Sequence, residues 1–281
     1  MSAAARLTAF AALLGLVFAV AAFAGDRVGW TPKRADDAGS SDGHGDTMAM
    51  APSGEAPPGL ATSQDGLTLK LDRTQVERNR RTTIAFRIVG KDGAPVRDFD
   101  VEHTKRMHFI VVRRDLTGFQ HLHPTQGSDG TWQTPLRLAD AGTYRVFADF
   151  SIKGVKHTLG ADVTVDGAAT ARPLPAPSSS ATVDGYRVTL DDGATHAGRD
   201  SQLRFTLIKD GERVEVDPYL GARGHLVALR EGDLAYLHVH PDADSLSFMA
   251  EFPSAGRYRL FLQFRHGGRV HTAEFTQEAT P

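Results

Sequence analysis

Histidines are the residues of this chain whose type and spacing indicate chemistry. Eight of the twelve recur as four pairs, in the same order in two halves of the 281-residue sequence. The pairs are His108 with His225, His121 with His238, His123 with His240, and His157 with His271. Incidental surface histidines would rarely stay in register through a duplication, so the repeated unit uses imidazole for a specific purpose.

The pairs predict a transition-metal site in each half. In a His-x-His motif both side chains leave the same face of a strand, about 6–7 Å apart, so that both can bind one ion. The predicted ligand sets are His108, His121, His123 and His157 in the first half, and His225, His238, His240 and His271 in the second. Ligation by histidine without thiolate suits Cu(II) or Zn(II). We expect copper, with zinc as the alternative.

A purely structural role for the histidines is the competing interpretation. His157 shares strand parity with Leu159 and Val163, and His271 shares it with Phe275, which are plausible core positions. A buried neutral histidine that hydrogen-bonds a backbone carbonyl needs no metal. In this interpretation the chain is an extracytoplasmic adhesion or scaffold module whose histidines brace the fold.

A tandem cupin-like metalloenzyme is the enzymatic alternative, since cupins combine a β-sandwich with a His-x-His pair, a carboxylate and a distant histidine. The histidine spacing fits, but the carboxylate expected shortly after His-x-His is missing from the first half, and only the second half offers Asp244. The sequence also carries no HExxH motif, nucleophile elbow or glycine-rich phosphate loop. We therefore expect a protein that is not an enzyme.

The repeat also predicts the fold. Segments rich in β-branched and aromatic residues, such as 67–71, 83–89 and 108–112, alternate with Asp-Gly turn signals. About a hundred residues with about seven strands per copy are typical of an immunoglobulin-like β-sandwich. We predict an all-β protein with tandem immunoglobulin-like domains at 62–166 and 182–281, joined by a linker rich in proline, alanine and serine at 167–181.

Two tyrosines are assigned to the fold and not to a site. Tyr144 and Tyr258 each follow an Ala-Gly pair just before a strand, at equivalent positions of the two copies. This pattern resembles the tyrosine corner of immunoglobulin-like domains, in which the hydroxyl bonds back to the backbone.

The N-terminal region predicts an address outside the cytoplasm. Residues 1–25 contain an apolar run that suits either an uncleaved transmembrane helix or a signal peptide. Residues 26–61 lack hydrophobic periodicity and are interpreted as a disordered linker. His44, Met48 and Met50 in this linker slightly favour copper, because thioethers bind Cu(I). We expect a single-pass membrane protein with extracytoplasmic domains, or a secreted one if the segment is cleaved.

Charge and cysteine content exclude other partners. The net charge is −2, from 32 Lys and Arg against 34 Asp and Glu, so a nucleic-acid partner is not expected. The sequence has no cysteine, which excludes disulfides and thiolate ligands. No feature of the sequence identifies a protein partner.

Several motifs together resemble a known group of proteins. They are Asp92-Gly93-Ala94-Pro95-Val96, Met107-His108, the pair His121 and His123, and the run from Ala141 to Phe147. The arrangement resembles exported bacterial proteins with tandem YtkA-like or CopC-like immunoglobulin-type domains, and residues 218–225 resemble the matching segment of their second domain. The resemblance covers nearly all of 62–280 and implies copper or heavy-metal handling without a defined reaction.

Overall fold

The computed structural model describes residues 57–191, 195–237 and 239–281. These residues form strands, turns and loops, and none of them lies in a helix. Within this part of the chain there is accordingly no helix long and apolar enough to cross a bilayer. The predicted N-terminal helix, residues 1–25, lies outside the described residues, as does most of the predicted linker 26–61.

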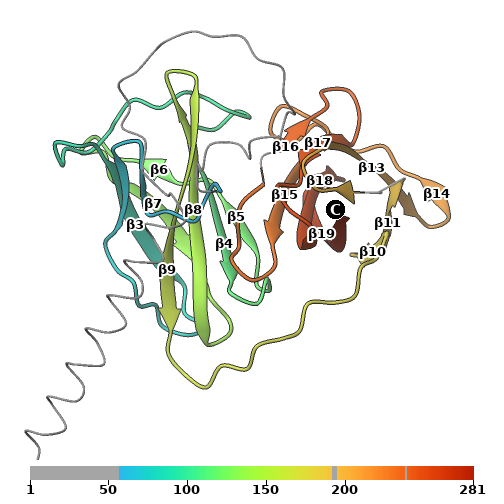
Figure 1. Cartoon of the computed structure of the whole chain (residues 1–281), viewed down its shortest axis with the longest axis horizontal. Helices are drawn as coiled ribbons and strands as arrows, with labels where there is room; N and C mark the ends of the chain where they lie inside the picture. Colours follow the sequence, from blue (N-terminus) through green and yellow to red (C-terminus); the bar gives the residue numbers. More distant parts are fainter. Residues whose placement is uncertain (1–56, 192–194, 238) are drawn as a thin grey trace, which may run out of the picture. The chain divides into compact units, whose positions relative to one another are not determined.

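The first repeat is a sandwich of two antiparallel sheets (Figure 1). One sheet has the order β1-β2-β3-β7-β6 and the other β5-β4-β8-β9. Their bounds are β1 Ser63–Gln64, β2 Leu67–Leu71, β3 Thr82–Val89, β4 His108–Arg113, β5 Gln120–Leu122, β6 Thr125–Gln126, β7 Trp132–Leu136, β8 Gly142–Ile152 and β9 Val155–Val165.

The second repeat has the same two-layer plan. One sheet has the order β10-β11-β13-β17-β16, with β14 paired to β13, and the other has the order β12-β19-β18-β15. Their bounds are β10 Ser180–Val183, β11 Tyr186–Asp191, β12 Thr195–His196, β13 Asp200–Lys209, β14 Glu212–Arg213, β15 His225–Arg230, β16 Val239–Pro241, β17 Ser247–Glu251, β18 Gly256–His266 and β19 Arg269–Thr280.

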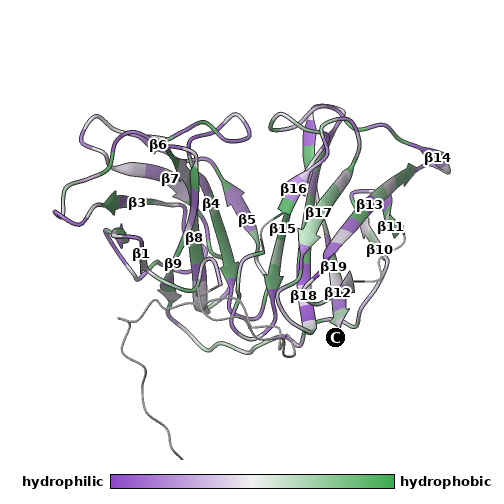
Figure 2. Cartoon of the chain, turned by 45° about the horizontal axis from the view of Figure 1, so that its top comes forward, coloured by the Kyte–Doolittle hydropathy of each residue, from purple (hydrophilic) through white to green (hydrophobic). Residues whose placement is uncertain are grey.

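Alternating side chains build a core inside each sandwich. Along β7 and β13 buried residues alternate with exposed ones, as expected for strands with one face on a core. The strands β4 and β15 differ, because they are apolar without alternation, and Figure 2 shows both as largely hydrophobic. Continuous apolar strands are typical of sheets buried on both faces.

Strands β4 and β15 each have one face on the core of their own sandwich, and each buries its other face against the other repeat. Ile110, Val112 and Phe147 of the first repeat form one apolar cluster with Val227 and Phe261 of the second. This cluster is separate from the two sandwich cores. The apolar runs in β4 and β15 are thereby explained, since each strand serves a core on one side and the contact between repeats on the other.

Aromatic pairs show that this contact is reciprocal. Phe119 of the first repeat stacks on Phe261 of the second, with ring centroids 4.1 Å apart. The equivalent pair in the opposite sense is Tyr236 with Phe147, with centroids 5.5 Å apart. Equivalent residues thus exchange roles across the contact, as they do in an interface with twofold symmetry.

The predicted tyrosine corners are confirmed. The Tyr144 hydroxyl donates a hydrogen bond to the Asp140 carbonyl at 3.0 Å, and the Tyr258 hydroxyl donates one to the Ser254 carbonyl at 2.7 Å. Both tyrosines are buried at the start of a long strand, β8 or β18. They stabilise the turn before the strand and take no part in a site.

The predicted linkers are more integrated into the fold than their compositions indicate. Gly59 donates a backbone hydrogen bond to Thr158 of β9, so the end of the linker 26–61 lies against the first sandwich. In the segment 167–181, Leu174 packs on the cluster between the repeats, and Arg172 bonds Asp140. Strand β10 begins at Ser180, before the predicted start of the second domain at 182.

Candidate metal centre between the two repeats

The strand register brings two of the predicted ligands to one face. His108 begins β4, and His121 lies on β5 opposite Ile110 of β4. Residues 108 and 110 share strand parity, so both imidazoles leave the sheet on the face that meets the second repeat. His123 follows two positions after His121 and keeps its parity, as the His-x-His motif predicts.

Hydrogen bonds fix the tautomers of the first two imidazoles. His108 Nε2 donates to the Glu102 carbonyl at 3.1 Å, and His121 Nδ1 donates to Gln263 Oε1 at 2.7 Å. In the neutral rings the remaining nitrogens, His108 Nδ1 and His121 Nε2, therefore carry lone pairs. These two atoms lie 2.9 Å apart. Two facing lone pairs repel each other unless a proton or a cation lies between them.

His123 supplies a third nitrogen without a partner. Its Nε2 atom is buried and has no hydrogen-bond partner among the described residues. One ring nitrogen from each of His108, His121 and His123 lies within 4.8 Å of the other two. Metal–nitrogen bonds of about 2.0–2.1 Å hold opposite ligands about 4.2 Å apart, so small side-chain shifts would close this set around an ion.

The second repeat contributes His225 to the same cluster. Its ring stacks on that of His108, with centroids 5.3 Å apart and planes 7° apart, and lies 4.6 Å from the ring of His121. His225 is the equivalent of His108 in the second repeat. The two repeats therefore bring their matched histidines to one shared cluster.

Burial keeps these imidazoles neutral. It lowers the pKa of His108, and together with the neighbouring histidines it lowers the pKa of His121 and of His225 well below the usual value. Burial and the nearby His108 lower the pKa of His123 to about 4. Neutral imidazole is the form that binds a metal ion, so the cluster has its ligands in the required protonation state near pH 7.

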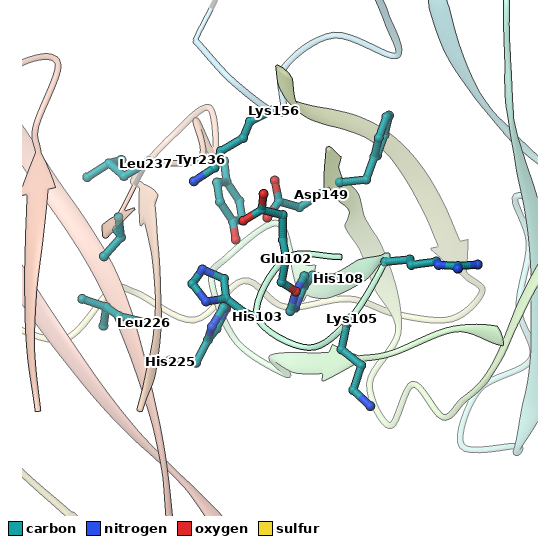
Figure 3. Close-up of a pocket in the computed structure, with 13 residues that line it drawn as sticks. Glu102, His103, Lys105, His108, Asp149, Lys156, His225, Leu226, Tyr236 and Leu237 are labelled. Carbon is teal, nitrogen blue, oxygen red and sulfur yellow. The ribbon is translucent and has the colours of Figure 1, made fainter. Parts of the chain in front are cut away.

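A small pocket of about 50 Å³ lies beside the cluster. His103, His108 and His225 line one side of it, and Asp149 and Tyr236 line another (Figure 3). Burial raises the pKa of Asp149 to about 6, although a hydrogen bond from Thr158 opposes the shift. The pocket gives solvent a route to the histidines.

His103 also belongs to this cluster, although it is not among the ligands predicted from the repeat. Its ring lies 6.1 Å from that of His108 and 5.7 Å from that of His225. Its backbone has a φ of 47°, in the left-handed region that is uncommon outside glycine and is enriched at functional sites. His103 has no equivalent in the second repeat, so the repeat could not identify it; its position five residues before His108 was the available signal.

His157 and His271 do not lie in the cluster. His157 pairs in register with Phe150, a core residue of the first sandwich, and His271 pairs with Phe264 in the second. The residues beside those phenylalanines, Asp149 and Gln263, pair with His108 and His225. Neighbouring strand positions point to opposite faces, so His157 and His271 leave their sheets on the faces away from the cluster.

Carboxylates accompany both of these histidines. His157 Nδ1 lies 3.6 Å from Asp65, and His271 Nδ1 lies 2.7 Å from Asp184. The structural interpretation of the histidines thus describes these two. A cupin-like site would need His157 beside His121 and His123, and the register places it on the other face of the sheet.

The second His-x-His pair consists of His238 and His240, and the structure describes only His240. His238 lies outside the described residues. His240 is exposed on β16, where it pairs with Met249 in the other sheet of the sandwich. Of the second predicted set, His225 lies at the cluster of the first repeat, whereas His240 and His271 lie elsewhere among the described residues.

Comparisons with solved structures return proteins of low similarity. An alpha-2-macroglobulin from Salmonella is 15% identical over 80% of this chain and has a TM-score of 0.29. The Escherichia coli adhesin FdeC is 13% identical over 79% with a TM-score of 0.27, and InvD of Yersinia pseudotuberculosis is 13% identical over 78% with a TM-score of 0.28. The chain spans 15%, 66% and 58% of these structures, and at such TM-scores the likeness carries no argument about function.

Comparison of the sequence is more informative. No curated protein matches the chain significantly. The family described as "Domain of unknown function (DUF8832)" matches twice, at residues 61–167 and 181–281. The two matches confirm the internal repeat, whereas the more specific resemblance to YtkA-like or CopC-like domains stays a prediction. Since the matches cover most of the sequence, the chain belongs to the DUF8832 family and carries its domain in two copies.

Proposed function

We propose that the chain binds one transition-metal ion, copper before zinc, through His108, His121 and His123. The observation that carries this proposal is the set of three ring nitrogens with nothing else to bind: two facing lone pairs 2.9 Å apart and the unpartnered, buried His123 Nε2. A cation at this point would satisfy all three at once.

The outer contacts of these histidines suit a metal site. Metal-binding histidines almost always donate their second N–H to a carbonyl or carboxylate, which fixes the tautomer and orients the ring. His108 donates to the Glu102 carbonyl and His121 to the Gln263 side-chain carbonyl. Both bonds direct the free lone pair of the ring toward the shared point.

Ligand chemistry favours copper. The set contains imidazole nitrogens and no carboxylate, and the chain contains no cysteine. Such sets suit Cu(II) and Zn(II), and Cu(II) binds the more tightly of the two at nitrogen ligands of ordinary geometry. We propose binding and not catalysis, and an extracytoplasmic location, exported or membrane-tethered, in keeping with the N-terminal apolar segment.

Calorimetric titration with Cu(II) and with Zn(II) tests the proposal. The titration uses the full chain with the substitution His44→Ala, so that the N-terminal segment offers no imidazole to the metal. His123→Ala should abolish the tight site, whereas His240→Ala, at the equivalent and exposed position of the second repeat, should leave it intact. Equal affinities of these two variants would refute the site.

A further inference from the structure

We infer that the second repeat completes this metal site, with Gln263 as a positioning residue and His225 as its cover, so that metal loading and docking of the two repeats are linked. The inference rests on the proposed metal binding. All three proposed ligands come from the first repeat, and the inference adds that their affinity for the metal depends on contacts with the second repeat.

Gln263 holds His121 in the metal-binding tautomer. Its Nε2 donates to Thr272 Oγ1 at 3.3 Å, which leaves Oε1 directed at His121 Nδ1. An oxygen at this position can only accept, so the proton of the neutral ring stays on Nδ1 and the lone pair stays on Nε2. Nε2 is the atom that faces His108.

His225 covers the cluster from the same strand pair. It lies opposite Gln263 in the register of β15 and β18, so both side chains leave the second repeat on one face. Its ring stacks on His108 and lies near His121, so it covers one side of the cluster.

Separation of the repeats would therefore remove two supports at once. His121 would lose the acceptor that fixes its tautomer, and the lone pairs of the cluster would be solvated. Loss of such an outer contact weakens metal binding by about 10–100-fold. Because linkage is reciprocal, a bound ion strengthens docking of the repeats by the same factor.

Two substitutions of Gln263 separate positioning from general stability. Gln263→Leu keeps the size and removes the acceptor, whereas Gln263→Glu keeps an acceptor at the same place. In the full chain Gln263→Leu should weaken Cu(II) binding by about 10–100-fold, and Gln263→Glu should bind at least as well as the parent. Gln277→Leu is the matched control, because Gln277 is also buried in the second sandwich but bonds the Ser178 carbonyl. It should not change the affinity.

Amide hydrogen exchange provides a readout that does not depend on affinity. Copper at saturation should slow exchange in β15 and β18 of the parent chain, although these strands supply none of the three ligands. In the Gln263→Leu variant at saturating copper, the slowing of exchange in β15 and β18 should be smaller than in the parent chain. The slowing of exchange in β4 and β5, which carry ligands, should persist.

The outcomes distinguish this inference from the proposed function. If His123→Ala abolishes binding but Gln263→Leu binds like the parent and β15 gains no protection, the inference is wrong and the metal site stands. If His123→Ala binds like the parent, the metal site is refuted and this inference falls with it.

Discussion

His108 and His225 occupy equivalent positions in the two repeats, and their rings stack 5.3 Å apart with planes tilted by only 7°. The duplication has thus brought one histidine position into contact with its own copy. Around this contact lie the Phe119–Phe261 pair and its counterpart, Tyr236 with Phe147. The histidine cluster is therefore a property of the interface between repeats.

Acid should weaken the apo protein. An unfolded histidine titrates near pH 6.5, and the folded pKa values of the cluster lie below this, to about 4 for His123. Between these values the unfolded chain binds more protons, so stability is full above about pH 6.5 and falls as the pH is lowered toward 4. Asp149 has a raised pKa of about 6, so its protonation favours the folded state as the pH falls. This single group offsets only part of the effect of the several histidines. The melting temperature of the apo chain should drop from pH 7 to pH 5.

The control for this pH effect is a variant without the protonatable rings. His121→Phe/His123→Phe should show a flatter dependence of melting temperature on pH over the same range. A parent chain as stable at pH 5 as at pH 7 would contradict the neutral, desolvated state of the cluster.

The aromatic contact between the repeats should be measurable as a coupling energy. Phe119 and Phe261 stack with centroids 4.1 Å apart, and such pairs contribute about 0.5–1.5 kcal/mol beyond the area they bury. A double-mutant cycle of Phe119→Leu and Phe261→Leu, followed by chemical denaturation, should give a coupling in this range. Additive effects of the two substitutions would show that the repeats do not dock as described.

The tyrosine corners should contribute stability without affecting metal binding. Tyr144→Phe removes the hydrogen bond to the Asp140 carbonyl, and Tyr258→Phe removes the one to Ser254. Each loss should cost about 0.5–1.5 kcal/mol in free energy of unfolding, as is typical of one hydrogen bond. The affinity for Cu(II) should stay that of the parent. A large loss of affinity in either variant would give these tyrosines a role in the site.

Much of the fold follows from the sequence because β-structure leaves local signals. Alternating apolar residues, Asp-Gly turns and the repeated Ala-Gly-x-Tyr motif predict two similar β-domains, and two family matches confirm the duplication. The boundaries between domains and linkers do not follow from the sequence in the same way, because composition does not report long-range hydrogen bonds. Arg172 and Leu174 look like linker residues, yet they bond and pack against the sandwiches.

The site was only partly predictable, because the repeat identifies positions and not the faces they occupy. His157 and His271 are as well matched as His108 and His225, but neighbouring strand positions send them to opposite sides of the sheet. The signal for a shared site was the unbroken apolar run in each of β4 and β15, which indicates burial on both faces. Gln263 carried no such signal, since its equivalent in the first repeat is Asp149.

Electron paramagnetic resonance during a Cu(II) titration of the His44→Ala chain shows how many tight Cu(II) sites the chain has and how many imidazoles bind each. We expect one tight Cu(II) per chain, coordinated by at least three imidazole nitrogens, and loss of that signal in His121→Ala/His123→Ala. Two equivalent tight sites per chain, or a signal that persists unchanged in the double variant, would contradict a single metal centre shared by the two repeats.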